Sequence, residues 1–277
     1  METQQYEHHL SLLRDKLCPF KIKTSRNVKN TVCNWHENIE ILVVREGEGM
    51  IQYGAEEFAI AKGDVVVVNS GALHRPFSET GISFDYLIID ESFCLENGLE
   101  TSSKSFEKRV RSEKLISLCR IAGERYDSYQ SEPSPIGAAR LRASVLEILI
   151  TLFEDHILQR DSVSPLQKSS EEYVKKTIEY LTEHCTENVT LEAVAAECGV
   201  TKYHLAREFK RFTGQTVFTY LNVLRCKRAE RCLSSGMTVT EAAYECGFES
   251  LSYFSRTYKK LMGVLPRSSR TARGAQL

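Results

Sequence analysis

The stretch AAECG at Ala195–Gly199 recurs as AYECG at Ala243–Gly247, 48 positions further along the chain. Gly199 and Gly247 can supply the positive φ that a sharp turn between two helices needs. Each copy is followed by a segment with apolar residues at helical spacing that leads to a glycine: Leu205–Arg211 before Gly214, and Phe254–Lys260 before Gly263. The repeat therefore predicts two helix–turn–helix units near the C-terminus.

The second helix of each unit has one apolar face and one polar face. In the first unit, Leu205, Phe209 and Phe212 recur at i, i+4 and i+7, which predicts the buried stripe. A helix of this kind fits the DNA major groove, where Arg pairs with guanine and a small side chain can contact a thymine methyl. We expect the opposite stripes to face DNA: Lys202, Tyr203, Ala206, Arg207 and Lys210 in the first unit, and Leu251, Ser252, Ser255, Arg256 and Lys259 in the second.

Not every member of these stripes has the same expected role. Leu251 lies one turn before Phe254, so it could pack inward instead of facing DNA. Lys210 and Lys259 lie near the helix ends and suit phosphates better than bases. For each cation the alternative is a solvated helix face, but matched positions in two repeats favour DNA.

One helix, roughly residues 216–233, separates the two units. It would span about 27 Å, close to the ~34 Å of one DNA turn, so both second helices could enter the same face of a duplex. The charge of the chain is distributed accordingly: residues 1–168 carry a net −5, whereas residues 169–277 carry a net +4 and contain no Asp. A basic C-terminal part favours local contact with nucleic acid.

Composition excludes several other classes of protein. The nine cysteines include no CxxC pair, which argues against a disulfide framework or a zinc ribbon. Cys198 and Cys246 occupy equivalent positions before the turn glycines, where we expect them to pack in the core. We find no apolar run of the roughly twenty residues that span a bilayer, and no signal peptide, so we expect a soluble cytoplasmic protein.

The N-terminal part has a different pattern. From Ile39 to about Asp90, short apolar strands alternate with Gly- or Asn-containing turns, as in a sandwich or small barrel. A helical period then begins near Val110, and a second helix, roughly residues 135–158, is apolar over more than one face. That helix could pack on the barrel and also meet a partner subunit, or it could be buried wholly within its own domain.

These C-terminal residues resemble the AraC/XylS class of bacterial transcription regulators, whose DNA-binding domain is two helix–turn–helix units joined by a linker helix. The resemblance covers Leu191 to about Arg270 and includes the turn at Gly247–Ser250 and the segment Gly263–Pro266. It implies that Tyr203, Ala206 and Arg207, with Leu251, Ser252, Ser255 and Arg256, lie toward the bases. The chain departs from the family at Leu265, where Ser or Thr is usual, and at Ser269, where Tyr is common.

The segment from Asn34 to Glu40, followed by Gly47, resembles the first cupin motif, and Gly63, Gly71 and His74 resemble the second. Cupins are double-stranded β-helix barrels. In metal-binding cupins the resemblance would place His36, Glu40 and His74 around one ion, with Asn34 where a further His belongs. We favour no metal and no cofactor, and assign these three residues a structural or effector-binding role. Other candidate effector contacts are Trp35, Tyr53 and Arg75.

The sequence thus predicts a chain of mixed α and β domains, with a cupin-like barrel followed by an all-α double helix–turn–helix domain. The expected boundaries are 1–100 for the effector-binding barrel, 101–160 for a helical dimerisation segment, 161–170 for a linker and 171–277 for the DNA-binding domain. We expect a non-enzymatic, homodimeric transcription activator controlled by a small effector such as a sugar, with double-stranded DNA and RNA polymerase as partners. The alternatives are a metal-dependent cupin enzyme with a helical appendage, and a protein-interaction role for the helical part.

Overall fold

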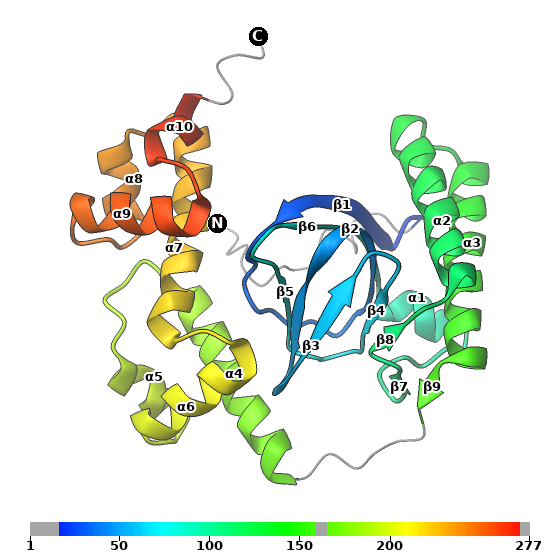
Figure 1. Cartoon of the computed structure of the whole chain (residues 1–277), viewed down its shortest axis with the longest axis horizontal. Helices are drawn as coiled ribbons and strands as arrows, with labels where there is room; N and C mark the ends of the chain where they lie inside the picture. The colour runs from blue at the N-terminus through cyan, green and yellow to red at the C-terminus, as the bar shows by residue number, and fades with distance from the viewer. Residues whose placement is uncertain (1–16, 159–164, 272–277) are drawn as a thin grey trace. The chain divides into compact units, whose positions relative to one another are not determined.

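The computed structural model describes residues 17–158 and 165–271, which divide into two compact units on either side of Pro165 (Figure 1). Within these residues, no helix is long and apolar enough to cross a membrane. The fold class expected from the sequence is confirmed: a β-barrel domain with helices precedes an all-helical domain.

The N-terminal unit is built on a seven-stranded sheet in which five strands follow the order β1-β6-β2-β4-β8, and β3 and β5 also pair with β2. Two short strands, β7 and β9, form a separate pair. The strands are β1 Phe20–Val28, β2 Ile39–Tyr53, β3 Glu56–Ala61, β4 Val65–Val68, β5 His74–Phe77, β6 Ile82–Ile89, β7 Ser105–Phe106, β8 Arg109–Val110 and β9 Ile157–Leu158; the helices are α1 Glu91–Glu96, α2 Glu113–Ser131 and α3 Pro135–Asp155.

β2 is the strand that closes the barrel. Residues 40–43 pair with β4, residues 48–53 pair with β3, and residues 50–53 also pair with β5, so one strand contributes to both sides of the barrel. The change of direction coincides with a register irregularity after Val44. At Gly47 the φ angle is 81°, and a Cβ atom would lie 2.6 Å from the carbonyl oxygen of Gly81. Only glycine fits this close approach, so Gly47 bends a continuous strand where the sequence suggests a break.

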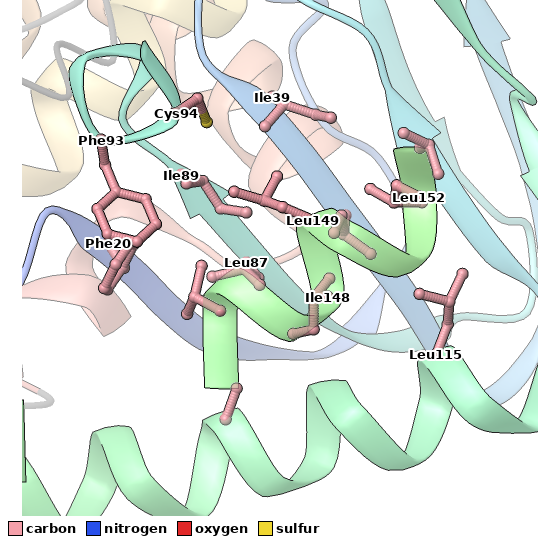
Figure 2. Packing of buried hydrophobic residues seen from close by; sticks show 14 of the residues in the cluster. Phe20, Ile39, Leu87, Ile89, Phe93, Cys94, Leu115, Ile148, Leu149 and Leu152 are labelled. Atoms are coloured by element: carbon pink, nitrogen blue, oxygen red, sulfur yellow. The ribbon is translucent and has the colours of Figure 1, made fainter. Parts of the chain in front are cut away.

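The first half of β2 is buried on both faces because helices cover its outer side. Ile39, Ile41 and Val43 point outward to a cluster that includes Leu149 of α3, whereas Leu42 and Val44 point into the barrel. Figure 2 shows residues of α3 and of the strands meeting in the outer cluster. The apolar side of α3 is therefore covered within its own unit.

Two sequence expectations differ from the structure of this unit. Val110, expected on a helix, lies in β8 and pairs with Val65. β1 has no counterpart among the expected strands, because its alternation of polar and half-buried residues gives a weak signal. Of the expected linker 161–170, residues 161–164 lie outside the described part of the chain, and Pro165 starts a helix, a position that proline favours.

The C-terminal, helical unit contains α4 Pro165–Glu183, α5 Leu191–Glu197, α6 Lys202–Thr213, α7 Val217–Ser234, α8 Val239–Glu245, α9 Leu251–Met262 and α10 Pro266–Thr271. The helix–turn–helix units are α5–α6 and α8–α9, and α7 joins them (Figure 1). The expected caps are confirmed: Thr190 and Thr201 accept hydrogen bonds at the starts of α5 and α6, and Thr238 forms a capping box with Glu241.

Candidate nucleic-acid interface and barrel site

α6, the reading helix of the first unit, presents the expected stripe away from its core. Leu205, Phe209 and Phe212 are fully buried. On the other side, Tyr203 is 79% exposed and the Arg207 side chain is 72% exposed. Of the remaining members of the stripe, Lys210 is exposed, and Lys202 and Ala206 are half-buried. These side chains are therefore accessible to a macromolecule the size of a DNA duplex.

Arg207 is held along the helix by two neighbours that sequence reasoning did not single out. Its Nε donates to Glu208 Oε1 at 3.2 Å, and its Nη2 lies 3.3 Å from His204 Nδ1. Glu208 also accepts from Arg211 Nη2 at 2.6 Å. Burial would raise the pKa of Glu208, but hydrogen bonds from Arg211, Ser170 and Arg207 lower it below its usual value. The signal for this arrangement is a buried acid flanked by arginines at i−1 and i+3.

A depression of about 490 Å³ borders this stripe. Tyr203 and Ala206 of α6 line one side, and Phe218 of α7 lines another. At its edge, Lys202 Nζ lies 2.6 Å from Glu192 Oε1, which ties the start of α6 to α5. The depression adds apolar surface beside the cationic residues.

α9, the reading helix of the second unit, repeats this exposure. Phe254 and Tyr258 are buried, whereas Ser252, Arg256 and Lys259 are exposed and Ser255 is half-buried. Leu251 is half-buried and packs against the core cluster that contains Phe254, so it lies at the edge of the outer stripe. Tyr253 is a further exposed side chain of α9, and its hydroxyl accepts a hydrogen bond from Asn222 of α7 at 2.9 Å.

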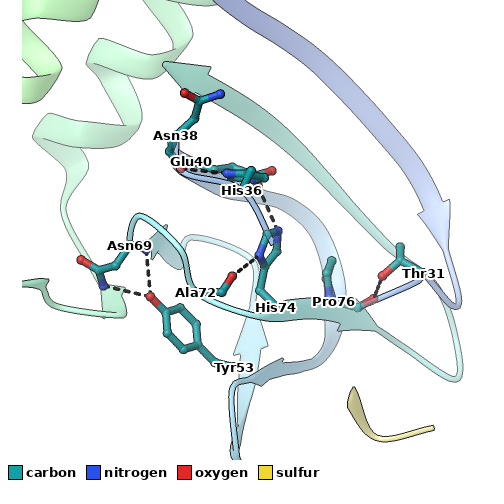
Figure 3. Close-up of polar contacts among 9 residues, drawn as sticks. All are labelled: Thr31, His36, Asn38, Glu40, Tyr53, Asn69, Ala72, His74 and Pro76. Atoms are coloured by element: carbon teal, nitrogen blue, oxygen red, sulfur yellow. Dashed lines mark hydrogen bonds and ion pairs between the residues drawn. The ribbon is translucent and has the colours of Figure 1, made fainter. Parts of the chain in front are cut away.

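In the barrel, the structure brings together three of the six candidate effector residues. His36 Nε2 and His74 Nε2 each lie 3.0 Å from the same atom, Glu40 Oε2 (Figure 3). His36 is 5% exposed, Glu40 7% and His74 3%. The other nitrogen of each ring faces a backbone carbonyl: His36 Nδ1 donates to Asn38 at 2.8 Å, and His74 Nδ1 donates to Ala72 at 3.0 Å. Carbonyl oxygens only accept, so both Nδ1 atoms carry hydrogen and both Nε2 atoms are directed at the carboxylate.

The electrostatics of this cluster favour an ionised Glu40. Burial alone would raise the pKa of Glu40, but the hydrogen bonds and charges of His36 and His74 outweigh it and hold that pKa well below its usual range. The same three donor atoms lie within 4.8 Å of one another and form a donor set that a divalent cation accepts. The Nδ1–H groups bonded to carbonyls are the outer contacts that ligating histidines commonly make.

Tyr53 contributes to the same barrel but contacts different residues. Its hydroxyl accepts hydrogen bonds from the backbone N and from Nδ2 of Asn69, both at 2.9 Å (Figure 3). Arg75 follows His74 in β5 and so points to the opposite face of the strand. There its Nη1 donates to Asn30 Oδ1 at 2.9 Å, and its guanidinium lies 4.2 Å from the Phe77 ring centroid. Trp35 is half-buried on the segment that precedes the cluster.

Comparison with known proteins agrees with this division of the chain. Residues 194–272 match the family model of a helix-turn-helix domain, and residues 30–89 match that of a cupin domain. The HTH-type transcriptional activator RhaS of Salmonella schwarzengrund is 26% identical over 261 residues, covering 87% of each protein. The HTH-type transcriptional regulator YdeC of Bacillus subtilis is 23% identical over 263 residues, covering 90% of this chain and 89% of that protein. A structure of ToxT from Vibrio cholerae is 16% identical with a TM-score of 0.46, covering 90% of this chain and 97% of that one.

A cupin barrel joined to an AraC-type double helix–turn–helix domain defines a class of proteins that regulate transcription by binding DNA. The chain belongs to this class: it is a transcription regulator of the AraC/XylS family.

Proposed function

We propose that the chain activates transcription by reading two adjacent segments of DNA major groove with α6 and α9. The observation that carries this proposal is the pair of matched outward faces, with Arg207 and Arg256 exposed at equivalent positions. In each helix a buried stripe fixes which side faces out, so the exposed side chains are presented together. The relative RhaS is named a transcriptional activator, which supports activation rather than repression.

Within each reading helix the residues have different roles. Arg207 and Arg256 contact base edges, whereas Lys210 and Lys259, nearer the helix ends, hold phosphates. To pair with guanine, Arg207 exchanges its contact with His204 for one with the base, while Glu208 continues to orient its Nε. Tyr203, Ala206 and Ser255 add contacts beside these arginines.

The barrel binds the regulating effector, a small polar molecule such as a sugar. This proposal is supported by the buried polar side chains of the barrel: His36, Glu40, His74 and Tyr53 are each at most 7% exposed. Linkage requires the effector to bind more tightly to the DNA-competent arrangement of the protein than to the other arrangement. A homodimer held by the helical segment 101–160, and a contact with RNA polymerase, complete the proposed mode of action.

Selection of binding sites from a random duplex library tests this function. Full-length protein at about 0.1 M salt should enrich a motif of two short blocks about ten base pairs apart. The selection should be run with and without cell extract as a source of effector. No enrichment in either case would refute DNA reading by these helices.

The geometry of the His36, Glu40 and His74 cluster is the observation that favours a metal-binding barrel as a second candidate. Asn34 stands where metal-binding cupins have a further His ligand, and the Nε2 atoms of His36 and His74 are both directed at Glu40 Oε2. We therefore propose that the barrel is not catalytic. Elemental analysis of purified protein tests this: stoichiometric iron, manganese or zinc that is lost in His36→Ala, together with turnover of a substrate, would overturn the proposal.

A further inference from the structure

The two helix–turn–helix units contact each other through the connection between α4 and α5, which runs beside α7 (Figure 1). Arg225 of α7 donates from Nε to the carbonyl of Cys185 at 2.7 Å, and from Nη2 to the carbonyl of Glu187 at 2.7 Å. The same guanidinium lies 5.8 Å from the ring centroid of Phe248, in the turn of the second unit. One side chain thus links the segment before the first unit to the turn of the second.

Gly247 makes the other half of this contact. Its φ is +80°, and a Cβ atom there would lie 2.7 Å from the carbonyl oxygen of Thr186 and 2.9 Å from two further backbone atoms of that residue. Backbone atoms cannot rotate away as a flexible side chain can, so a side chain at 247 must push the connection outward. Gly199, the matching glycine of the first unit, has a φ of +66° with nothing within 4 Å of a Cβ atom. Both glycines serve their turns, but only Gly247 also serves a contact between the units.

We propose that Arg225, Gly247 and the backbone of residues 185–187, here called the inter-unit clamp, set the spacing at which α6 and α9 read DNA. Arg225 and Gly247 act as positioning residues and touch no base. α7 alone packs its N-terminal half on the first unit and its C-terminal half on the second, so a bend or twist along it would change the separation of the reading helices. The inter-unit clamp adds a second connection between the two helix–turn–helix units, at a distance from the α7 axis. Two separate connections prevent one unit from rotating against the other, which α7 alone would allow. This inference rests on the proposed function, because spacing matters only to a protein that reads two blocks.

The consequence concerns spacing rather than base choice. Inserting one base pair between two blocks moves them apart by about 3.4 Å and turns them by about 35°. If α6 and α9 are held at a fixed separation, the protein can no longer bind the second block after such a change, and it loses the gain in affinity that simultaneous binding provides. If the two helices can move relative to each other, the protein still binds both blocks.

The experiment measures affinity for three kinds of DNA: the selected two-block site, the same site with one base pair inserted or deleted, and a single block. Wild-type protein should prefer the selected spacing by about tenfold or more. In Gly247→Ala and Arg225→Ala that preference should fall to about threefold or less, while affinity for a single block stays within about twofold. A merely structural loss would lower all three affinities together.

Two matched variants separate the clamp from other effects. Gly199→Ala introduces the same positive-φ strain without the clash, so it should keep the wild-type spacing preference. Arg225→Lys keeps the positive charge but replaces the fork that spans two carbonyls with a single ammonium, so it should lose the spacing preference as Arg225→Ala does. Far-UV circular dichroism establishes that each variant is folded, and Arg225→Lys carries the test if Gly247→Ala is not.

Retention of the tenfold spacing preference in folded Arg225→Ala and Arg225→Lys would overturn the inference. So would an equal loss of affinity for two-block and single-block DNA. A wild-type protein that binds no two-block site would instead refute the proposed function, which keeps the two failures distinct.

Discussion

Replacing Glu40 by Gln should destabilise the barrel more than any exchange of a surface carboxylate. The Nε2 atoms of His36 and His74 both lie 3.0 Å from Glu40 Oε2, which accepts from them when the rings are protonated, and all three side chains are nearly inaccessible to water. A hydrogen bond to a charged group contributes about 1.5–3 kcal/mol, and the neutral amide retains only weaker acceptance. Both rings contact the same oxygen, so the amide oxygen of Gln can take that position, but it carries no charge to attract them. We expect the free energy of unfolding to fall by about 2–4 kcal/mol.

Urea unfolding followed by the fluorescence of Trp35 measures this change directly. Trp35 is the single tryptophan of the chain and precedes His36, so its emission reports on the barrel and not on the helical unit. Glu46→Gln is the matched control, because Glu46 is an exposed carboxylate on the same strand. An unfolding free energy for Glu40→Gln within about 0.5 kcal/mol of the control would refute the view that the carboxylate holds both rings.

Three further predictions concern the helical unit. Lys210→Ala should weaken DNA binding almost equally for all sequences and reduce the slope of log affinity against log salt by about one, whereas an unchanged slope would exclude a phosphate contact. Thr238→Ala removes the hydroxyl that accepts from Glu241 N at 3.2 Å, so urea unfolding followed by circular dichroism should show a loss of about 1 kcal/mol; no loss would mean that the cap is not needed. Burial raises the pKa of Cys226 and Cys246 to about 12, so the folded state keeps thiol protons that the unfolded state releases above about pH 8.5. The free energy of unfolding should therefore be lower at pH 10 than at pH 7, and rapid alkylation of Cys226 in folded protein at pH 8 would contradict this burial.

The helical unit could be predicted closely because its signals are local. The positive φ at Gly199, Gly214 and Gly263, and the caps at Thr190 and Thr201, each depend on a few neighbouring residues. The contacts of Glu208 and Arg225 could not be predicted, for the opposite reason. Their roles depend on contacts with residues elsewhere in the fold, and a charged residue on a helix gives no sign of which backbone carbonyl it reaches.

The barrel was predictable in class but not in detail. The resemblance to the cupin motifs implied that His36, Glu40 and His74 lie together, and their donor atoms do lie within 4.8 Å of one another. The sequence did not show that β2 continues through Gly47, since a glycine in an apolar run marks a turn, a bulge or a close approach equally well. Arg75 could not be separated from His74 until the pairing of β5 with β2 fixed which residues point inward.

Selection of DNA sites with wild-type protein, Arg207→Ala and Arg256→Ala, carried out side by side, tests the central claim most directly. The wild-type protein should select two blocks, and each variant should lose base preference in one block only, a different block for each. The corresponding loss of affinity should be about 1–3 kcal/mol for either change. If both variants select the wild-type sequence, or if both lose the same block, the two helices do not read adjacent segments of DNA.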